Sequence, residues 1–360
     1  MPAKNEQPLK VLSDAEIDAL IITKPENQRY LEGFTGRDCY MLVSSGGNFL
    51  IADSRYTEMG EKECKTATVL PYSQPYPPLG DVLASVAKER SFGRVGFERG
   101  NITWGDYDNI SKRMEDAGVV MMPTSSLIEG MRAKKTPHES AMIGAACQIA
   151  DRALKDILSQ IRPGVSELDI KIELDYHLKT GGAEETAFDT IVLFGARSSQ
   201  PHANPRRDVY LRKGDLVLID YGAVKGGYRS DTTRTFVCGK ASGEQRSAYE
   251  AVLEAQMESI EMVMPGAEAG KVNDRAAGMI KDAGLLAFEH GIGHGVGLEI
   301  HELPSLRRGL DTVLESGNVI TIEPAMYRPG WGGIRIEDTV LVTDDGHSVL
   351  TFFPKELIEL

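Results

Sequence analysis

Cysteine and long hydrophobic runs are scarce in this sequence. The cysteines are scattered without any CxxC spacing, which excludes a disulfide framework or a zinc knuckle and is typical of buried thiols in a reducing compartment: Cys39, Cys64, Cys147 and Cys238. No apolar stretch approaches the roughly 20 residues that span a bilayer. The start of the chain also lacks the charged-then-apolar pattern of a signal peptide. We therefore expect a cytoplasmic protein with no membrane partner.

Positive charge is also in short supply. The chain carries 40 Lys and Arg against 53 Asp and Glu, a formal net charge of -13. The longest basic cluster, at 132–135, contains only three charges. Proteins that bind nucleic acid need a concentrated basic patch, so we expect no nucleic-acid partner. The length of 360 residues allows one large or two ordinary domains.

The first part of the chain alternates between strand and helix patterns. We expect strands near 19–22, 41–43, 49–51, 94–97 and 119–122, and helices near 79–90 and 104–117. This alternation predicts an α/β layer domain with a mixed, partly parallel sheet. A linker-like segment at 131–137 follows, so the predicted domains are residues 1–130 and 131–360.

The second part contains a weak internal repeat. Arg-Pro-Gly at 162–164 and Met-Pro-Gly at 264–266 are offset by 102 residues, and each follows one predicted helix and precedes another. The repeat suggests a pseudo-symmetric domain with its site between the two halves. A chance recurrence of Pro-Gly breakers is the alternative.

Residues 214–237 have the pattern of a β-hairpin, with an apolar run, a Lys-Gly-Gly turn signal at 225–227 and a second strand-like run. If the first two residues of that signal form the turn, Asp220 faces Asp231, with about 5 Å between the Cβ atoms. Like charges at that distance are destabilising unless a cation lies between them. A turn one residue different would place the carboxylates on opposite faces as solvated charges, so the hairpin alone leaves both interpretations open.

Three more hard ligands follow in compact motifs. His294 lies in Gly-Ile-Gly-His-Gly-Val-Gly, Glu323 in Val-Ile-Thr-Ile-Glu-Pro and Glu337 in Gly-Gly-Ile-Arg-Ile-Glu-Asp-Thr. An unpaired carboxylate in such apolar runs would cost several kcal/mol. Together with Asp220 and Asp231 they make four carboxylates and one imidazole, an oxygen-rich set that favours Mn²⁺ over thiolate-loving ions. Two divalent cations would neutralise the four negative charges and leave room for a bridging hydroxide.

These motifs resemble those of the pita-bread metallopeptidases, the family of aminopeptidase P, prolidase and methionine aminopeptidase, from about residue 136 to the C-terminus. In the first part, Asn-Gln-Arg-Tyr-Leu-Glu-Gly-Phe-Thr-Gly at 27–36 and Ala-Asp-Ser-Arg-Tyr at 52–56 resemble the creatinase-type domain of the proline-specific branch. The resemblance implies an α/β creatinase-type N-terminal domain with a mixed sheet and helices, followed by an α+β pseudo-symmetric pita-bread catalytic domain.

The resemblance also implies a ligand set. Asp231 and Glu337 would bridge two divalent metal ions, Asp220 would complete one of them, and His294 with Glu323 the other. We expect Mn²⁺, with Co²⁺ or Zn²⁺ as alternatives. Paired metal ions can hold a hydroxide and polarise a carbonyl, and Glu323 would additionally accept the proton of the bridging water.

Other residues match substrate-contacting positions of the family. His202, in Gln-Pro-His-Ala-Asn, and His301, in Glu-Ile-His-Glu, match histidines that contact the substrate carbonyl and pass protons to the leaving group. His290 matches a histidine of the proline-specific branch. Arg335 lies two residues before Glu337, on the same face of a strand, where it could orient a carboxylate or meet the substrate. Structural hydrogen bonds or ion pairs are the alternative for each. The remaining histidines are expected at the surface: His138, His177 and His347.

The first functional hypothesis is an Xaa-Pro aminopeptidase that acts on short peptides with proline at the second position. The alternative is an Xaa-Pro dipeptidase (prolidase), which shares the chemistry and differs in what closes the far side of the proline pocket. A third hypothesis is a non-catalytic peptide-binding module of the same fold, but such modules have generally lost the ligand set that this chain keeps. The resemblance further implies a homodimer or homotetramer, assembled with the help of the N-terminal domain.

Overall fold

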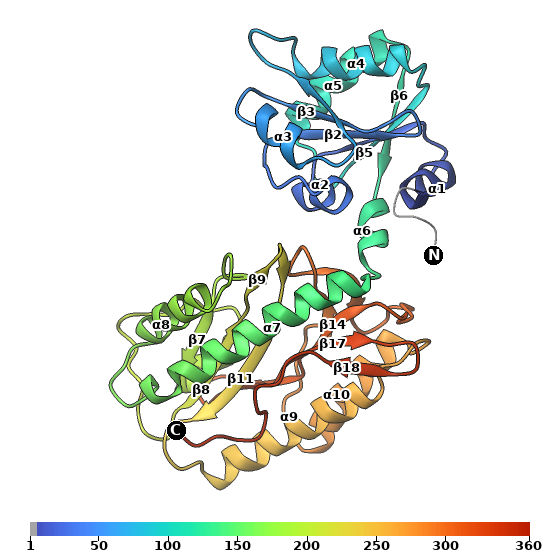
Figure 1. Cartoon of the computed structure of the whole chain (residues 1–360). Coiled ribbons are helices and arrows are strands. Elements are labelled where there is room, and N and C mark those ends of the chain that lie inside the picture. The colour runs from blue at the N-terminus through green and yellow to red at the C-terminus, as the bar shows by residue number, and fades with distance from the viewer. Residues whose placement is uncertain (1–5) are drawn as a thin grey trace. The chain divides into compact units, whose positions relative to one another are not determined.

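The computed structural model describes residues 6–360, and the chain divides into two compact units, Met1–Arg132 and Ala133–Leu360. The sequence predicts the domain boundary between residues 130 and 131. Figure 1 shows the elements of each unit in chain order.

The N-terminal unit is built on a six-stranded sheet with strand order β4-β3-β2-β1-β5-β6. Antiparallel pairs join β1 to β2 and β2 to β3, whereas β1–β5, β5–β6 and β3–β4 are parallel. The strands are β1 (Ala19–Ile22), β2 (Tyr40–Ser44), β3 (Phe49–Ala52), β4 (Thr68–Pro71), β5 (Arg94–Glu98) and β6 (Val120–Thr124). The predicted mixed α/β sheet is therefore confirmed.

Helices cover this sheet because its strands are apolar on both faces. Ala19 and Ile21 of β1 pack with Leu83 of α4 and Ile110 of α5, and α4 and α5 lie together on one side of the sheet in Figure 1. The next residues along the same strand, Leu20 and Ile22, are also fully buried. The helices are α1 (Glu6–Asp14), α2 (Pro25–Glu32), α3 (Thr57–Glu63), α4 (Leu79–Glu89), α5 (Trp104–Asp116) and α6 (Leu127–Arg132).

The second unit contains two similar helix pairs: α7 (Pro137–Ile157) with α8 (Glu167–Thr180), and α9 (Gly243–Glu261) with α10 (Ala269–Asp282). α8 and α10 each have 14 residues, and their bounds differ by 102 at both ends. Each is preceded by a Pro-Gly turn whose glycine has positive φ, 93° at Gly164 and 88° at Gly266, a conformation that glycine adopts without steric cost. The predicted repeat is thus confirmed as two pseudo-symmetric halves.

Each helix pair packs on its own strands. α7 and α8 cover the sheet β11-β8-β7, and α9 and α10 cover the sheet β13-β12-β14-β17-β18 together with the β15-β16 hairpin (Figure 1). The strands are β7 (Ile191–Phe194), β8 (Leu216–Tyr221), β11 (Thr232–Val237), β12 (Gly293–Gly295), β13 (Glu302–Leu306), β14 (Val319–Ile322), β15 (Ala325–Arg328), β16 (Gly332–Arg335), β17 (Asp338–Val342) and β18 (His347–Val349). Short 3-10 helices lie at Leu158–Gln160 (η1) and Gly195–Ser199 (η2).

The hairpin that carries the first two acids has a different register from the predicted one. Its turn is Gly226-Gly227, both with positive φ, between β9 (Val224–Lys225) and β10 (Tyr228–Arg229). Asp220 therefore pairs with Thr233 and not with Asp231, so the predicted pairing is wrong. The alternative expectation, that a turn displaced by one residue places the two acids on opposite faces, is also wrong. Moving a two-residue turn by one position shifts the pairing by two residues, and side chains two apart in a strand share a face. Asp231 thus stays on the face of Asp220.

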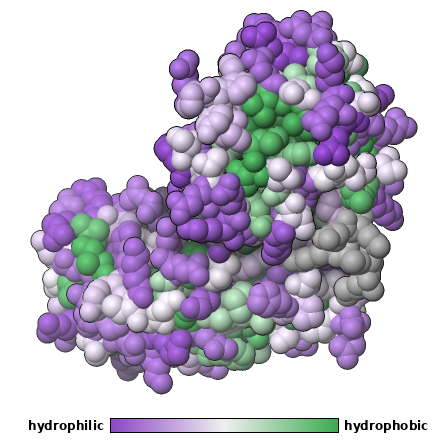
Figure 2. Space-filling view, turned by 45° about the horizontal axis from the view of Figure 1, so that its top comes forward, coloured by the Kyte–Doolittle hydropathy of each residue, from purple (hydrophilic) through white to green (hydrophobic). Residues whose placement is uncertain are grey.

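Within residues 6–360, no helix is both long and apolar enough to cross a membrane. The face drawn in Figure 2 is mostly hydrophilic, with smaller hydrophobic patches. All four cysteines are free thiols; Cys39, Cys147 and Cys238 are buried, whereas Cys64 is only half-buried.

Candidate active site

The five candidate ligands come from both halves of the second unit and converge at strand ends. Asp220 lies near the end of β8, Asp231 just before β11 and His294 within β12. Glu323 lies just after β14, and Glu337 lies between β16 and β17. All five are at least partly buried, and Asp231 and Glu337 are only 5% and 2% exposed. The apolar strands β8 and β14, which carry or precede Asp220 and Glu323, anchor these two residues in the two cores.

The ligand atoms lie close together. Asp231, His294 and Glu337 each offer an atom within 4.8 Å of those of the other two. His294 Nε2 lies 3.5 Å from Asp231 Oδ2 and 3.4 Å from Glu323 Oε1. Asp220 Oδ1 is buried without a hydrogen-bond partner among the described residues. The predicted residues are therefore brought together in one polar centre.

The protonation of His294 suits a metal ligand. Its Nδ1 lies 3.0 Å from the carbonyl oxygen of Gly295, which can only accept a hydrogen bond. Nδ1 therefore carries the proton, and the lone pair of Nε2 points at the carboxylates. Burial, with the neighbouring His301, lowers the pKa of His294 to about 4, so the ring is neutral at physiological pH. A neutral imidazole whose other nitrogen is held by a carbonyl is typical of a metal-bound histidine.

The acids repel one another. Burial and the nearby carboxylates raise the pKa values of Asp231 and Glu337 well above their usual range. Burial raises the pKa of Glu323 to about 8, although Arg335 opposes the shift. One arginine cannot compensate four carboxylates, and a bound cation would reverse this repulsion. The orphaned Asp220 oxygen, the Nε2 lone pair and the oxygen-rich donor set together fit divalent metal ions.

A layer of hydrogen bonds orients these ligands, and sequence reasoning had named Arg335 in it but missed Thr233 and Tyr327. The Thr233 hydroxyl donates to Glu337 Oε2 at 2.6 Å, and Arg335 Nε donates to the Thr233 hydroxyl at 2.9 Å. Arg335 also donates to Asp220 Oδ2 at 2.5 Å and to the Tyr327 hydroxyl at 2.8 Å. Arg335 thus orients a carboxylate in this structure. Strand alternation could have indicated Thr233, two residues after Asp231, but no sequence signal singles out Tyr327.

The three predicted histidines outside the ligand set lie around this centre. The ring of His301 is exposed and its centroid is 4.3 Å from that of His294. His290 Nδ1 is 2.7 Å from the Gly291 carbonyl oxygen, so its Nε2 accepts from Tyr327 at 3.4 Å. His202 is near enough to both His290 and His301 to lower their pKa values, although burial has the larger effect on each.

The histidines without a motif lie elsewhere. His138 is exposed as expected. His177 is half-buried with Nδ1 3.8 Å from Asp156, and His347 is half-buried with Nδ1 3.1 Å from the Val263 carbonyl oxygen. The last two are therefore not simple surface residues.

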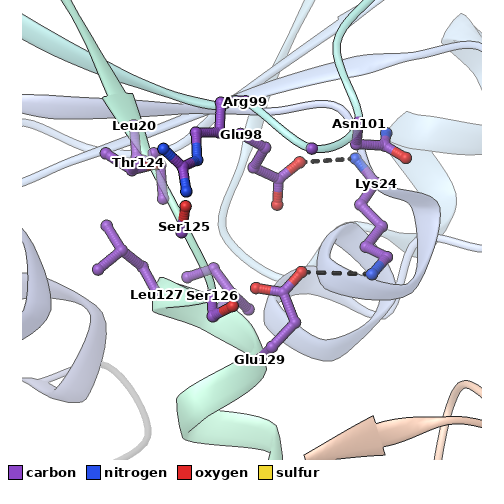
Figure 3. A pocket seen from close by; sticks show the side chains of 12 residues that line it. Leu20, Lys24, Glu98, Arg99, Asn101, Thr124, Ser125, Ser126, Leu127 and Glu129 are labelled. Carbon is purple, nitrogen blue, oxygen red and sulfur yellow. Dashed lines mark hydrogen bonds and ion pairs between the residues drawn. The ribbon is translucent and has the colours of Figure 1, made fainter.

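The N-terminal unit has a polar cavity of about 470 Å³, lined in part by Lys24, Glu98, Arg99 and Glu129 (Figure 3). Its acids already have donors. The Lys24 main-chain nitrogen donates to Glu98 at 2.8 Å, and the Lys24 ammonium lies 3.4 Å from Glu129. Since both carboxylates have donors within the fold, the cavity shows no requirement for a cation.

Comparison with known proteins agrees with this geometry. Residues 6–134 match the creatinase/prolidase N-terminal domain, and residues 141–344 match metallopeptidase family M24. The chain belongs to metallopeptidase family M24 and is a hydrolase. As a member of that family it is expected to bind divalent metal ions, and the polar centre described above is a possible site.

The similarity to individual relatives extends over the full chain. An Xaa-Pro dipeptidase from Pyrococcus furiosus is 36% identical over 360 residues, covering 99% of this chain and 100% of the relative. The solved structure of an Xaa-Pro dipeptidase from Bacillus anthracis has a TM-score of 0.94 and 37% identity, and the match covers 99% of both chains. An X-Pro aminopeptidase structure from Thermotoga maritima has a TM-score of 0.90 and 30% identity, again covering 99% of both chains.

Proposed function

We propose that this chain is an Xaa-Pro dipeptidase that uses two divalent metal ions. The observation that carries the proposal is the complete set of five ligands in a chain that matches Xaa-Pro dipeptidases from end to end. The sequence motifs first suggested an Xaa-Pro aminopeptidase, and these relatives favour the dipeptidase alternative. The non-catalytic hypothesis finds no support, because no ligand is missing.

In this proposal the two ions would be held by Asp220, Asp231, His294, Glu323 and Glu337, with Asp231 and Glu337 shared between them. The hard donor set favours Mn²⁺. Such ions, when bound, supply an activated water and polarise the substrate carbonyl. The chain's own contribution is orientation. Thr233 and Arg335 fix the carboxylates of Glu337 and Asp220, so these ligands need little reorganisation.

The proton-handling groups follow from the same geometry. Glu323 is the base for the attacking water, since its carboxylate lies in the polar centre with Oε1 3.4 Å from His294 Nε2. His301 is the group that passes a proton toward the leaving nitrogen, because its exposed ring lies beside His294. We propose that His202 and His290 contact the substrate at the same face.

The test compares initial rates on Ala-Pro, Ala-Pro-Ala and Ala-Ala with the Mn²⁺-loaded protein. A dipeptidase should prefer Ala-Pro over Ala-Pro-Ala in kcat/KM by more than about tenfold, because a site that pairs with the terminal carboxylate penalises a longer peptide. Ala-Ala should be cleaved poorly. Preferential cleavage of Ala-Pro-Ala would favour the Xaa-Pro aminopeptidase, the activity named for the Thermotoga maritima relative.

We also propose that the active form is a homodimer or homotetramer. Light scattering at micromolar concentration tests this, and a strictly monomeric active enzyme would contradict it.

A further inference from the structure

A buried ion pair lies outside the carboxylate centre. Lys135 Nζ is 2.7 Å from Glu302 Oε1, and both side chains are only 2% exposed. Charges buried this deeply are costly unless their partner is held in good geometry. The neighbouring pair of Lys134 and Glu315 offers a contrast, because those side chains are 55% and 57% exposed, where an ion pair contributes little.

The lysine end of this pair is fixed by its surroundings. The main-chain nitrogen of Lys135 donates to the Gly317 carbonyl at 2.7 Å, and the Asn318 side chain donates to the Ala133 carbonyl at 3.0 Å. The next residue, Thr136, caps α7 in a capping box with Glu139. Lys135 is therefore attached both to the start of the longest helix in its unit and to the segment that leads into β14.

The glutamate end lies directly after His301. Glu302 opens β13 and pairs with Gly295, the neighbour of His294. Its carboxylate rests on Gly297, where an added Cβ would lie 2.2 Å from Oε1. Only glycine permits this approach, which explains the last glycine of the Gly-Ile-Gly-His-Gly-Val-Gly motif. The segment 297–302 thus folds back around the Glu302 carboxylate.

A second anchor holds the same segment from the other side. The main-chain nitrogen of Arg229 donates to the Gly297 carbonyl at 2.8 Å, and Arg229 Nε donates to the Leu298 carbonyl at 3.1 Å. The backbone leading to His301 is therefore tied at its beginning to Arg229 and at its end to Lys135. This backbone sets where the main chain of His301 lies, and therefore the point from which its exposed ring projects.

We infer that Lys135 is a positioning residue for the reaction: through the buried carboxylate of Glu302 it fixes the backbone that presents His301 to the substrate. The inference rests on the proposed function insofar as His301 handles a proton in peptide hydrolysis. It assigns a catalytic consequence to a residue outside the proposed ligand set.

The first experiment replaces Lys135 with Met in the full-length, Mn²⁺-loaded protein, with Lys134→Met as the matched control. We expect Lys135→Met to lower kcat on Ala-Pro by about tenfold, within the range of coupling between contacting residues, and to leave KM within about twofold. Lys134→Met should leave both constants unchanged. Equal effects of the two substitutions, or an effect on KM alone, would overturn the inference.

The second experiment asks whether Lys135 acts through His301. In a His301→Ala background, Lys135→Met should cause no further loss of kcat, because the group that it positions is already missing. If the two losses multiply instead, Lys135 does not act through His301 and the inference fails.

The third experiment separates positioning from folding. Lys135→Met alone removes the ammonium beside the buried Glu302 carboxylate, so Lys135→Met/Glu302→Gln is made to remove both charges. We expect the double variant to regain thermal stability while kcat stays about tenfold low and amide exchange in 297–302 is faster than in the Lys134→Met control. A double variant with wild-type kcat and exchange would show that only the charge imbalance of the single variant mattered, which overturns the inference.

The amide-exchange measurement also distinguishes failure of the positioning role from failure of the proposed function. If the wild-type protein fails to hydrolyse Ala-Pro, the proposed function fails. Unchanged exchange in 297–302 on removal of Lys135 instead contradicts the positioning role, whatever the substrate.

Discussion

The two units of this chain treat buried carboxylates in opposite ways. In the N-terminal unit, Glu32 accepts hydrogen bonds from the main-chain nitrogens of 65–67 and from the side chains of Asn48 and Thr66, between 2.6 and 3.2 Å. Glu98 likewise accepts from the main chain at 23–24 and from Asn27. A carboxylate with that many donors is satisfied within the fold.

In the catalytic unit, Asp231 and Glu337 lie near other carboxylates and a histidine lone pair, and Asp220 has an oxygen without a partner among the described residues. This difference in hydrogen-bond donors separates structural carboxylates from functional ones. Both kinds are buried, so burial does not discriminate. What discriminates is whether the fold supplies donors or leaves a deficit of positive charge that a ligand must fill.

The consecutive residues Glu337 and Asp338 show the same contrast within the catalytic unit. Glu337 faces the polar centre, whereas Asp338 points to the other side of its strand and accepts from four side chains at 2.7–2.8 Å: Arg234, Gln256, Thr351 and Lys355. Burial of Asp338 opposes its ionisation, but Arg234 and Lys355 outweigh that effect and hold its pKa far below the usual range. For Glu337 the shift is upward.

The largest expected effect is on Glu337. Glu337→Gln should abolish hydrolysis, by more than about 10³-fold, and lower the metal content from two ions per chain to near zero, because a bridging carboxylate serves both ions. Elemental analysis after Mn²⁺ reconstitution measures the second effect. The metal-free variant should be at least as stable toward urea as the metal-free wild type, because a repulsive charge is gone. Full metal retention would contradict the bridging role.

Asp338→Asn should act on stability instead. The substitution leaves the buried Arg234 and the partly exposed Lys355 without their anion, and breaking a buried pair such as Arg234–Asp338 costs about 3–5 kcal/mol. Urea unfolding of the metal-free protein, beside Glu337→Gln under the same conditions, measures the difference. If the two variants lose equal stability, the distinction between the two acids is wrong.

His301→Ala should separate proton transfer from metal binding. We expect kcat to fall by roughly 10²-fold, the scale of a lost acid-base group, while the metal content stays that of the wild type. Elemental analysis and steady-state rates on the same sample decide it. Loss of the metals in this variant would place His301 among the ligands.

The sequence was sufficient for the parts that local patterns encode. The Pro-Gly repeat at Gly164 and Gly266 predicted the two halves, and the resemblance of the ligand motifs to those of the pita-bread metallopeptidases predicted that the five ligands form one site. The register of the hairpin was not predictable in this way, because Lys225-Gly226 and Gly226-Gly227 are both reasonable turns, and positive φ at two successive glycines decided between them.

Long-range hydrogen bonding also could not be read from the sequence. The Arg335–Tyr327 contact depends on the β15–β16 pairing, and the Lys135–Glu302 pair joins residues 167 positions apart (302 − 135). Composition identifies such residues only as charged or aromatic. Their partners become visible when the strands are in register.

The smallest expected effect concerns Glu32 and Glu98, the two hydrogen-bonded acids of the N-terminal unit. It tests the comparison by the sign with which the stability contribution of each acid changes with pH. Burial opposes ionisation of Glu32, but the hydrogen bonds from Asn48 and Thr66 outweigh it and lower its pKa. For Glu98, burial raises the pKa, and the bonds from Asn27 and the main chain offset it only in part.

A lowered folded-state pKa means that Glu32 contributes stability above its unfolded pKa of about 4.3, which is lost as pH falls through the folded value. A raised pKa means the reverse for Glu98: its contribution is largest below about pH 4.3 and declines as pH rises through the folded value. The stability lost on Glu32→Gln should therefore grow with pH, to about 1.5–3 kcal/mol at neutral pH. The stability lost on Glu98→Gln should shrink with pH.

Urea unfolding between pH 3.5 and 7, monitored by amide exchange of β1 and β2, measures how the stability loss of each variant changes with pH. The two strands report on the unit that carries both acids. Hydrolysis rates at neutral pH serve as the control and should stay at the wild-type level, because neither acid belongs to the polar centre. Slopes of the same sign would show that hydrogen bonding does not separate the two acids.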